Sequence, residues 1–355
     1  MAGYYFNLPP ITALTIPQQA ALDDLSQIAL SGGPGTGKSV VSLWRHISNY
    51  MSNPVKRSLL LTYTTTLKEY LRACCRNQNE EAAKMIATSM KYQYKIHSYK
   101  FEEIIIDEAQ DLDEKYYHGI LTKVSYGADD SQILYPEHSC TQLQLKGIFP
   151  ENVEHVLSRN FRSTQRIMKF ARVTFPNAVI PREIIEGLAN NVGELPVFMI
   201  PSNGISREII KDKQYNAILE IISTFKSDTH NIAILVPWKS DVQVFENILK
   251  GKVEDFSLYY ENKERFPDGC TTIKNVHITT FKSAKGLEFD TVIIPNFDIL
   301  NRLPIIVQDK DTGNNKTICD WQDLYVACTR AKSNLYLISN YDIPRLNSVV
   351  DRTIL

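Results

Sequence analysis

One segment near the N-terminus has the residue types and spacing of a loop that binds phosphate. Residues 32–39, GGPGTGKS, fit the pattern G-x-x-x-x-G-K-S/T and lie between an apolar run, Ile28–Ser31, and a predicted helix that begins at Lys38. Glycine lets backbone N–H groups turn toward phosphate oxygens, and the start of a helix directs partial positive charge at the same anion. This order of strand, loop and helix disfavours a glycine-rich turn without a ligand. The residues that the pattern predicts to bind a nucleotide are Gly33, Gly35, Thr36, Gly37, Lys38 and Ser39.

The end of this pattern and a later acidic pair would carry the chemistry. Lys38 would neutralise the β- and γ-phosphates, and the Ser39 hydroxyl would ligate Mg²⁺. Asp107 and Glu108 follow another apolar run at 103–106. Asp107, at the tip of a strand, would hold Mg²⁺ through water, and Glu108 would orient and deprotonate the attacking water. Such a pair is often only a solvated strand end, but together with a phosphate loop it predicts a nucleoside triphosphatase.

The composition predicts a globular protein of two domains. The chain has 355 residues, 43% of them hydrophobic and 22% charged. Its net charge of −1 gives no overall attraction for nucleic acid, so any such surface would be a local groove. No apolar run is long enough to predict a membrane span, and residues 1–10 lack the pattern of a secretory signal. The six cysteines are scattered without a C-x-x-C pair, so the expected location is the reducing cytoplasm.

Short apolar runs alternate with longer helical stretches, which predicts an α/β fold of parallel sheets and crossover helices. The predicted strands are 28–31, 58–62, 103–107, 124–126, 197–200, 231–235, 277–280, 291–294 and 334–338. The predicted helices include 38–50, 66–76 and 241–249. Residues 135–150, interrupted by prolines and a glycine, indicate a connection. We therefore place one lobe at residues 1–154 and a second lobe at residues 155–355.

Further short blocks stand in a fixed order along the chain. They are Gln18 in LTIPQQ, LTYT at 61–64, HSY at 97–99, DEAQD at 107–111, ADDSQ at 128–132, NFRS at 160–163, TFKSAKGLEF at 280–289 and YVACTRA at 325–331. With the phosphate loop, this series resembles superfamily 1 DNA helicases of the UvrD/Rep type, over the span from Gln18 to Ile338. Single blocks are weak signals, but their number and order are specific. The resemblance implies two tandem RecA-like P-loop lobes, each a mostly parallel sheet flanked by helices, that clamp ATP and Mg²⁺.

The resemblance also implies how the nucleoside part of ATP is bound. Gln18 would read the adenine edge with its amide, and Phe161 would stack on the base. Glu288 would accept a hydrogen bond from a ribose hydroxyl.

For the phosphates, the resemblance implies residues from both lobes. Gln132 would sense the γ-phosphate from the first lobe. Arg162 and Arg330, from the second lobe, would stabilise charge on the transferring phosphoryl group as arginine fingers. Because both lobes complete such a site, hydrolysis would couple to their opening and closing.

The same resemblance implies a face for single-stranded nucleic acid. The residues assigned to that face are Thr62, Tyr63, His97, Ser98, Phe281 and Lys282. Hydroxyl groups and the lysine would contact phosphates, and the aromatic rings would stack on bases. A structural alternative carries more weight here than at the ATP site, because Tyr and Phe beside strands usually belong to the core.

The chain departs from the family pattern at several points. Few residues separate HSY from the next predicted strand, and 249–276 is short, whereas full-size relatives carry inserted accessory domains at these places. Ala128 stands where a Gly-Asp pair usually begins, Lys282 replaces a usual His, and the Trp expected after Gln132 is missing. We therefore expect two motor lobes without the large insertions, a form in which ATP hydrolysis is better supported than strand separation.

Three functions remain to be compared. The leading hypothesis is an ATP-dependent translocase or helicase on single-stranded DNA, moving 3′ to 5′, with a subunit role in a DNA repair or phage-defence complex as one setting for it. The alternative is an ATP-switched regulatory subunit that controls a protein partner such as a nuclease. A binding protein that no longer hydrolyses ATP is disfavoured because the catalytic residue types are retained. Stimulation of ATP hydrolysis by bare single-stranded DNA separates the first two, while the choice of DNA or RNA and the oligomeric state stay open.

Overall fold

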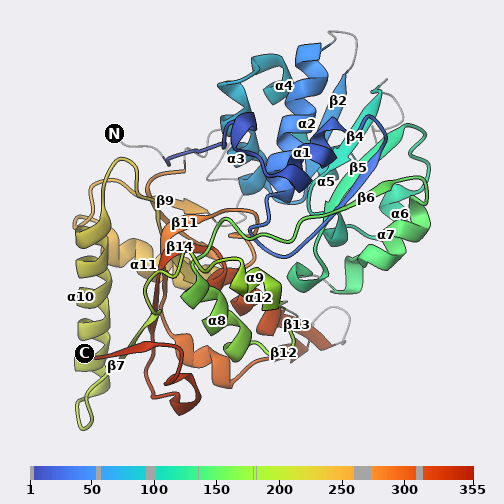
Figure 1. The fold of residues 1–355 in the computed structure, drawn as a ribbon. Coiled ribbons are helices and arrows are strands. Elements are labelled where there is room, and N and C mark those ends of the chain that lie inside the picture. The colour runs from blue at the N-terminus through green and yellow to red at the C-terminus, as the bar shows by residue number, and fades with distance from the viewer. Residues whose placement is uncertain are drawn as a thin grey trace. The chain divides into compact units, whose positions relative to one another are not determined.

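The computed structural model describes residues 4–52, 57–92, 101–134, 136–178, 180, 182–259, 273–308 and 315–355, which form two compact units. The N-terminal unit is Phe6–Phe161, and the C-terminal unit is Arg162–Leu355 together with Tyr4 and Tyr5. Each unit is a mostly parallel sheet flanked by helices (Figure 1). The predicted fold class, two α/β lobes in tandem, is therefore confirmed. Within the described ranges no helix is long and apolar enough to cross a membrane.

The sheet of the N-terminal unit has six strands in the order β3-β2-β4-β5-β1-β6. The strands are β1 (Ile28–Ser31), β2 (Ser58–Thr62), β3 (Ile86–Thr88), β4 (Glu103–Ile106), β5 (Lys123–Ala128) and β6 (Val153–Val156). All neighbouring pairs are parallel. Strands β2 and β4 are buried along their whole length, because helices cover the sheet on both faces. Parallel pairing places the carboxyl ends of β1, β4 and β5 at one edge of the sheet, where the loops after them meet.

Several helices of the N-terminal unit begin where their sequence supplies a cap. The helices of this unit are α1 (Ile16–Asp23), α2 (Lys38–Ser52), α3 (Thr65–Arg76), α4 (Glu80–Lys84), α5 (Ser89–Tyr92), α6 (Glu114–Tyr117) and α7 (Gln142–Ile148). Thr64 caps α3 by accepting a hydrogen bond from the backbone N–H of Leu67, at 3.1 Å. Thr15 and Gln18 form a capping box at the start of α1. This capping box fixes a side chain that the sequence analysis assigns to nucleotide binding.

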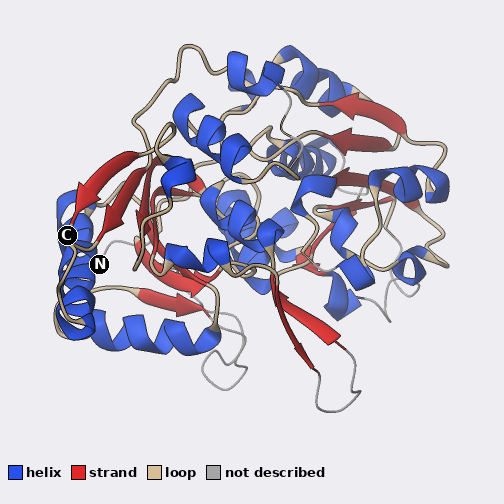
Figure 2. Ribbon diagram, turned by 90° about the horizontal axis from the view of Figure 1, so that it is seen from below, coloured by secondary structure: helices blue, strands red, loops and turns tan. Residues whose placement is uncertain are grey.

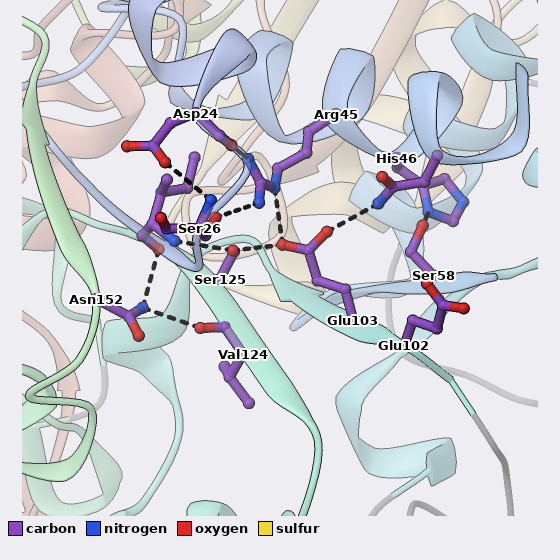
Figure 3. A network of polar contacts seen from close by, with 12 residues as sticks. Asp24, Ser26, Arg45, His46, Ser58, Glu102, Glu103, Val124, Ser125 and Asn152 are labelled. Carbon is purple, nitrogen blue, oxygen red and sulfur yellow. Dashed lines mark hydrogen bonds and ion pairs between the residues drawn. The ribbon is translucent and has the colours of Figure 1, made fainter. Parts of the chain in front are cut away.

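A buried polar network ties α2 to the amino ends of the strands (Figure 3). Arg45 Nε donates to Glu103 Oε1 at 2.7 Å, and Asn49 Nδ2 donates to Glu103 Oε2 at 2.8 Å. Ser125 Oγ also donates to Glu103 Oε1, and Arg45 Nη1 donates to the Asp24 carbonyl at 2.7 Å. Buried charges are tolerated when they are paired and hydrogen-bonded in this way. The network therefore holds α2, which starts at the phosphate loop, against β4, which ends one residue before Asp107.

The units divide at a different residue from the one placed by the sequence analysis. The compact N-terminal unit continues to Phe161, whereas the sequence analysis divides the chain at 154/155. Strand β6 extends the first sheet beside β1, with Ile28 opposite Val153. Beyond β6, the backbone N–H of Leu157 donates to the carbonyl of Ser31 at 2.8 Å. These backbone hydrogen bonds attach strand β6 and the loop after it to the sheet of the N-terminal unit.

The sheet of the C-terminal unit has seven strands in the order β15-β7-β14-β11-β8-β10-β9, with all pairs parallel. The strands are β7 (Val197–Ile200), β8 (Ile232–Val236), β9 (Ser257–Tyr259), β10 (Val276–Thr280), β11 (Phe289–Ile294), β14 (Ala331–Ile338) and β15 (Asp351–Ile354). The helices are α8 (Gln165–Thr174), α9 (Arg182–Glu186), α10 (Arg207–Phe225), α11 (Lys239–Leu249) and α12 (Trp321–Cys328). An antiparallel hairpin, β12 (Ile305–Gln308) and β13 (Asn315–Cys319), extends away from this sheet (Figure 2).

Because His46 and His277 are buried, we expect the free energy of unfolding to fall in mild acid. His46 contacts the Ser58 hydroxyl at 2.8 Å and the Ala82 carbonyl at 2.9 Å, and His277 contacts the Ser257 hydroxyl at 2.8 Å. Burial lowers the pKa of each to about 4. The folded state keeps both neutral while the unfolded chain takes up protons near pH 6.5, so the free energy of unfolding falls as pH drops from about 6.5 to about 4. The expected loss is roughly 3 kcal/mol for each histidine.

Urea unfolding between pH 7 and pH 4.5 measures this loss. His46→Gln should make the free energy of unfolding less dependent on pH, because it removes one of the two groups. The exposed His118 gives the matched control, and His118→Gln should keep the wild-type dependence. Equal pH profiles for His46→Gln and the wild type would show that His46 is not the group responsible.

Candidate nucleotide site

The predicted phosphate loop connects β1 to α2 and has a backbone that only glycine adopts readily. Gly32, Gly35 and Gly37 have φ values of +146°, +71° and +90°. A Cβ at Gly32 would lie 2.3 Å from the carbonyl oxygen of Leu157, and a Cβ at Gly37 would lie 2.3 Å from Gln18 Nε2. Both the dihedral angles and the close neighbours therefore require glycine at these positions.

Lys38 reaches back over this loop. Its Nζ donates to the carbonyls of Gly32 at 2.7 Å and Gly33 at 3.0 Å, and lies 3.6 Å from Asp129 Oδ2. The Thr36 hydroxyl donates to the Gly33 carbonyl at 2.9 Å, which tightens the turn. Lys38 is buried, at 7% exposure, so its charge acts with little screening by solvent. An ammonium group at the start of a helix, beside a glycine loop, has the character of an anion-binding site.

The two predicted acidic residues lie at the carboxyl end of β4, and both are buried. Glu108 has left-handed backbone angles, φ 59° and ψ 45°, which cost a non-glycine residue roughly 1–3 kcal/mol. Its Oε2 accepts a hydrogen bond from Gln110 Nε2 at 2.6 Å. Gly127 in β5 lies between the loops, because a Cβ there would be 3.5 Å from both Asp107 Oδ1 and Lys38 Cβ. The structure therefore brings the acidic pair beside the first turn of α2.

Asp129 and Gln110 connect these residues, and the sequence analysis assigns neither to the site. Gln132 Nε2 donates to Asp129 Oδ2, the same oxygen that faces the Lys38 ammonium. Gln110 Oε1 accepts the backbone N–H of Asp129 at 3.2 Å while its amide nitrogen holds Glu108. Both residues stand inside blocks that the sequence analysis recognises, but the role of Asp129 follows from its closeness to the buried Lys38, which only the structure shows. The phosphate loop, the acidic pair and Gln132 thus share one polar network.

These residues fit a nucleoside triphosphate with Mg²⁺. Mg²⁺ takes oxygen ligands and usually combines one or two protein groups with phosphates and water. The Ser39 hydroxyl in the first turn of α2 and the Asp107 carboxylate supply such oxygens, and Lys38 supplies the cation for phosphate. Glycines at positions 32, 35 and 37 leave the inside of the loop open to backbone contacts.

A cavity of about 500 Å³ lies next to the loop, within the N-terminal unit. Its lining includes Thr15, Gln18, Thr36, Arg159 and Phe161. Gln18 Oε1 accepts the backbone N–H of Thr15 at 2.9 Å, and its Nε2 donates to the Thr36 carbonyl at 3.0 Å. Both bonds fix the orientation of the amide. The Phe161 ring is 46% exposed, and its backbone N–H donates to the Gly35 carbonyl at 2.8 Å.

The remaining residues predicted to contact ATP belong to the C-terminal unit. Arg162 Nε donates to Glu288 Oε2 at 3.1 Å, so the structure brings these two together. Arg330 is fully buried at the end of α12, where its Nε donates to the Val326 carbonyl at 2.9 Å and its Nη1 donates to the Leu287 carbonyl at 3.4 Å. The arginine-finger roles of Arg162 and Arg330 stay predictions.

The residues predicted to contact nucleic acid differ in how much side chain they expose. Thr62 is buried at the end of β2, and Tyr63 is half-buried against the core of the N-terminal unit. Phe281 is 1% exposed, and its backbone N–H donates to the Val236 carbonyl at 2.9 Å, so burial leaves its ring no open face for stacking. The predictions at His97 and Ser98 lie outside the described residues.

Lys282 is the predicted contact with a partly exposed charge. Its Nζ lies 3.7 Å from Asp323 Oδ2. Burial raises the pKa of Asp323 to about 7, and the Lys282 ammonium opposes that rise. Asp323 also accepts the backbone N–H of Asp320 at 3.0 Å in the capping box of α12. The Lys282 ammonium is therefore oriented by the Asp323 carboxylate, which the capping box holds at the start of α12.

Comparison with known proteins finds similarity to helicases in both sequence and fold. Residues 253–342 match the model of the UvrD-like helicase C-terminal domain. The chain is 26% identical over 266 residues to the putative ATP-dependent DNA helicase R568 of Acanthamoeba polyphaga mimivirus, and the match covers 68% of the chain and 35% of that protein. The chain thus spans about a third of the length of this relative. The crystal structure of the DUF1998 helicase MrfA bound to DNA matches 95% of the chain and 47% of its own, with a TM-score of 0.52 and 11% identity.

These findings differ in what they establish. The likeness to the MrfA structure, at this identity, shows that the fold is similar to the RecA-like folds of helicases. The family match and the viral relative show that parts of the chain are similar in sequence to helicases. The UvrD/Rep type and the compact form without insertions stay predictions.

Proposed function

We propose that the chain is an ATP-dependent translocase or helicase of the UvrD/Rep type that moves 3′ to 5′ on single-stranded DNA. The observation that carries the proposal is the Lys38 ammonium, held over a glycine loop and 3.6 Å from Asp129, in one network with Glu108 and Gln132. The resemblance of the viral relative, a putative ATP-dependent DNA helicase, supports the DNA part of the proposal.

Hydrolysis would use the residues at the carboxyl edge of the first sheet. Ser39 and Asp107 would hold Mg²⁺, which would neutralise charge on the phosphates. Glu108 would accept a proton from the water whose oxygen attacks the γ-phosphorus. The bond between the γ-phosphorus and the bridging oxygen breaks, releasing ADP and inorganic phosphate. Lys38 would stabilise the charge that develops on the phosphate oxygens.

Two groups of residues would link this chemistry to movement. Gln132, bonded to the carboxylate that faces Lys38, would report the presence of the γ-phosphate. Arg162 and Arg330 of the C-terminal unit would contribute positive charge to the transferring phosphoryl group, and Glu288 would bind the ribose. Since both units would contribute, ATP binding and release would open and close them, which is how nucleotide turnover drives motion.

Base selection would come from the fixed amide of Gln18. Its bonds to Thr15 and Thr36 leave one N–H and one oxygen lone pair for a ligand. Adenine offers an N7 acceptor and an N6 donor along one edge, which match that pair, whereas guanine offers two acceptors. Phe161 would stack on the base. The pocket therefore favours ATP over GTP.

A Gly37→Ala substitution should weaken ATP binding roughly tenfold, equivalent to about 1.4 kcal/mol. The added Cβ would meet Gln18 Nε2 at 2.3 Å, and alanine is strained at a φ of +90°. Titration with a fluorescent ATP analogue measures the affinity. Gly147→Ala in α7 is the matched control, because a Cβ there meets nothing within 4 Å. Wild-type affinity in the Gly37→Ala variant would contradict the close fit of Gln18 to the loop.

For nucleic acid, Tyr63 and Lys282 are the described residues best placed to act, and contacts at His97 and Ser98 stay predictions from the sequence. The Lys282 ammonium would contact a backbone phosphate, and Tyr63 would contact a base or sugar. Thr62 and Phe281 are buried and would support the neighbouring exposed residues.

Displacement of streptavidin from biotinylated oligonucleotides tests both movement and direction. We expect ATP-dependent displacement from the 5′ end and much slower displacement from the 3′ end, because a 3′ to 5′ motor runs toward the 5′ end. Faster displacement from the 3′ end would reverse the assigned direction. No displacement from either end would reject a translocase and favour an ATP-switched subunit that controls a partner such as a nuclease.

A further inference from the structure

Arg159 lines the cavity beside the phosphate loop, and neither the predicted site nor the proposed function gives it a role. Its guanidinium carbon lies over the Phe161 ring, 5.1 Å from the ring centroid. Both side chains are exposed and both line the cavity of about 500 Å³ beside the phosphate loop. Among the described residues that line this cavity, Arg159 is the only one with a charged side chain.

The segment that carries Arg159 is anchored on both sides, to the end of β1 and to the phosphate loop. On one side, the backbone N–H of Leu157 donates to the Ser31 carbonyl at 2.8 Å. On the other, Asn160 Nδ2 donates to the Pro34 carbonyl at 2.7 Å, and the backbone N–H of Phe161 donates to the Gly35 carbonyl. The loop geometry therefore sets the position of the guanidinium and of the ring together.

We propose that Arg159 is a positioning residue for base binding in this cavity, supporting the Phe161 ring on one face while the nucleobase stacks on the other. The inference rests on the proposed ATP site. A guanidinium over an aromatic ring is attracted by the ring's negative face, and this attraction strengthens when a base covers the pair and excludes water. The support orders an exposed ring before the ligand arrives, which lowers the entropy that binding has to offset. Arg159 therefore increases the affinity for the base of the nucleotide and not the affinity for its phosphates.

The test separates these two parts of the ligand. Arg159→Ala should weaken ATP binding about three- to tenfold, consistent with the strength of cation–π contacts. Its affinity for inorganic tripolyphosphate, which has the phosphates without a base, should be unchanged. The ATP affinity of Arg159→Lys should lie between those of the wild type and Arg159→Ala, because lysine keeps the charge and loses the planar group. In steady-state hydrolysis the KM for ATP should rise while kcat stays the same, because the contact is equal in ground and transition states.

Arg76→Ala is the matched control, since it removes an exposed arginine from the same unit at the end of α3. It should bind both ligands as the wild type does. Equal losses of ATP and tripolyphosphate affinity in Arg159→Ala would overturn the inference, because Arg159 would then act on the phosphates. Wild-type ATP affinity in that variant would overturn it as well. A wild-type protein that binds neither ligand would instead reject the proposed ATP site, and with it the role of Arg159.

Discussion

Lys38→Ala should reduce ATP hydrolysis by roughly 10²- to 10³-fold, the usual cost of removing one preorganised donor from a transition state. In the structure the Lys38 ammonium bridges the glycine loop, through the Gly32 and Gly33 carbonyls, to Asp129. Alanine removes the cation that would face the β- and γ-phosphates and leaves the buried Asp129 carboxylate to repel them. Binding of ATP should weaken together with turnover. A coupled assay of phosphate release and an ATP titration measure the two effects.

Lys84→Ala controls for the loss of a lysine in the same unit. Lys84 lies at the end of α4, with 55% of its side chain exposed, and its Nζ pairs with Glu81 at 2.6 Å. This variant should hydrolyse ATP at the wild-type rate. If Lys38→Ala kept normal hydrolysis, the glycine loop would not be the phosphate site, and the assignment of the whole network would fail.

Glu108→Gln should retain ATP binding and lose roughly 10²- to 10⁴-fold in turnover, the range for removal of a general base. The substitution keeps the shape of the side chain, and the amide oxygen of glutamine can still accept the hydrogen bond that Gln110 Nε2 gives to Glu108. It removes only the carboxylate that would take the proton from water. Single-turnover hydrolysis after ATP is bound distinguishes slow chemistry from weak binding.

Glu114→Gln is the matched control, because Glu114 is exposed in α6 a short distance along the chain. It should behave as the wild type in both binding and turnover. Normal turnover by Glu108→Gln would assign the base to another residue. Loss of ATP binding in that variant would instead give Glu108 a structural role in its left-handed turn.

The sequence was sufficient to predict the parts of the fold that local chemistry determines. The loop at 32–39 could be placed between a strand and a helix because glycines, Lys38 and Ser39 each have a defined position in such a loop. Strands Ile28–Ser31, Ser58–Thr62 and Val197–Ile200 were predicted with the bounds that the structure has, because each is a short apolar run with clear flanks. The site followed from residues that lie at strand ends, where parallel strands collect their loops.

Other features depend on contacts that a pattern of residues does not contain. Strand β6 (Val153–Val156) is an edge strand with mostly exposed side chains, so it lacks the apolar signal of the central strands. Strand β13 falls partly in a segment that reads as a polar loop, because its pairing with β12 is what makes it a strand. Phe281 was assigned to nucleic acid by its motif, and only the packing of the sheet shows that it is buried. Asp129 is assigned to the site because its carboxylate lies 3.6 Å from the Lys38 ammonium, and this distance cannot be read from the sequence.

Steady-state ATP hydrolysis by the purified chain, with and without single-stranded DNA at low salt, tests the central claim most directly. Low salt is required because contacts with backbone phosphates weaken steeply as salt rises. We predict Mg²⁺-dependent hydrolysis that single-stranded DNA stimulates strongly and that Lys38→Ala reduces roughly 10²- to 10³-fold. Hydrolysis that does not respond to DNA would contradict a DNA motor and favour control by a protein partner. The absence of any Lys38-dependent hydrolysis would contradict the proposed function as a whole.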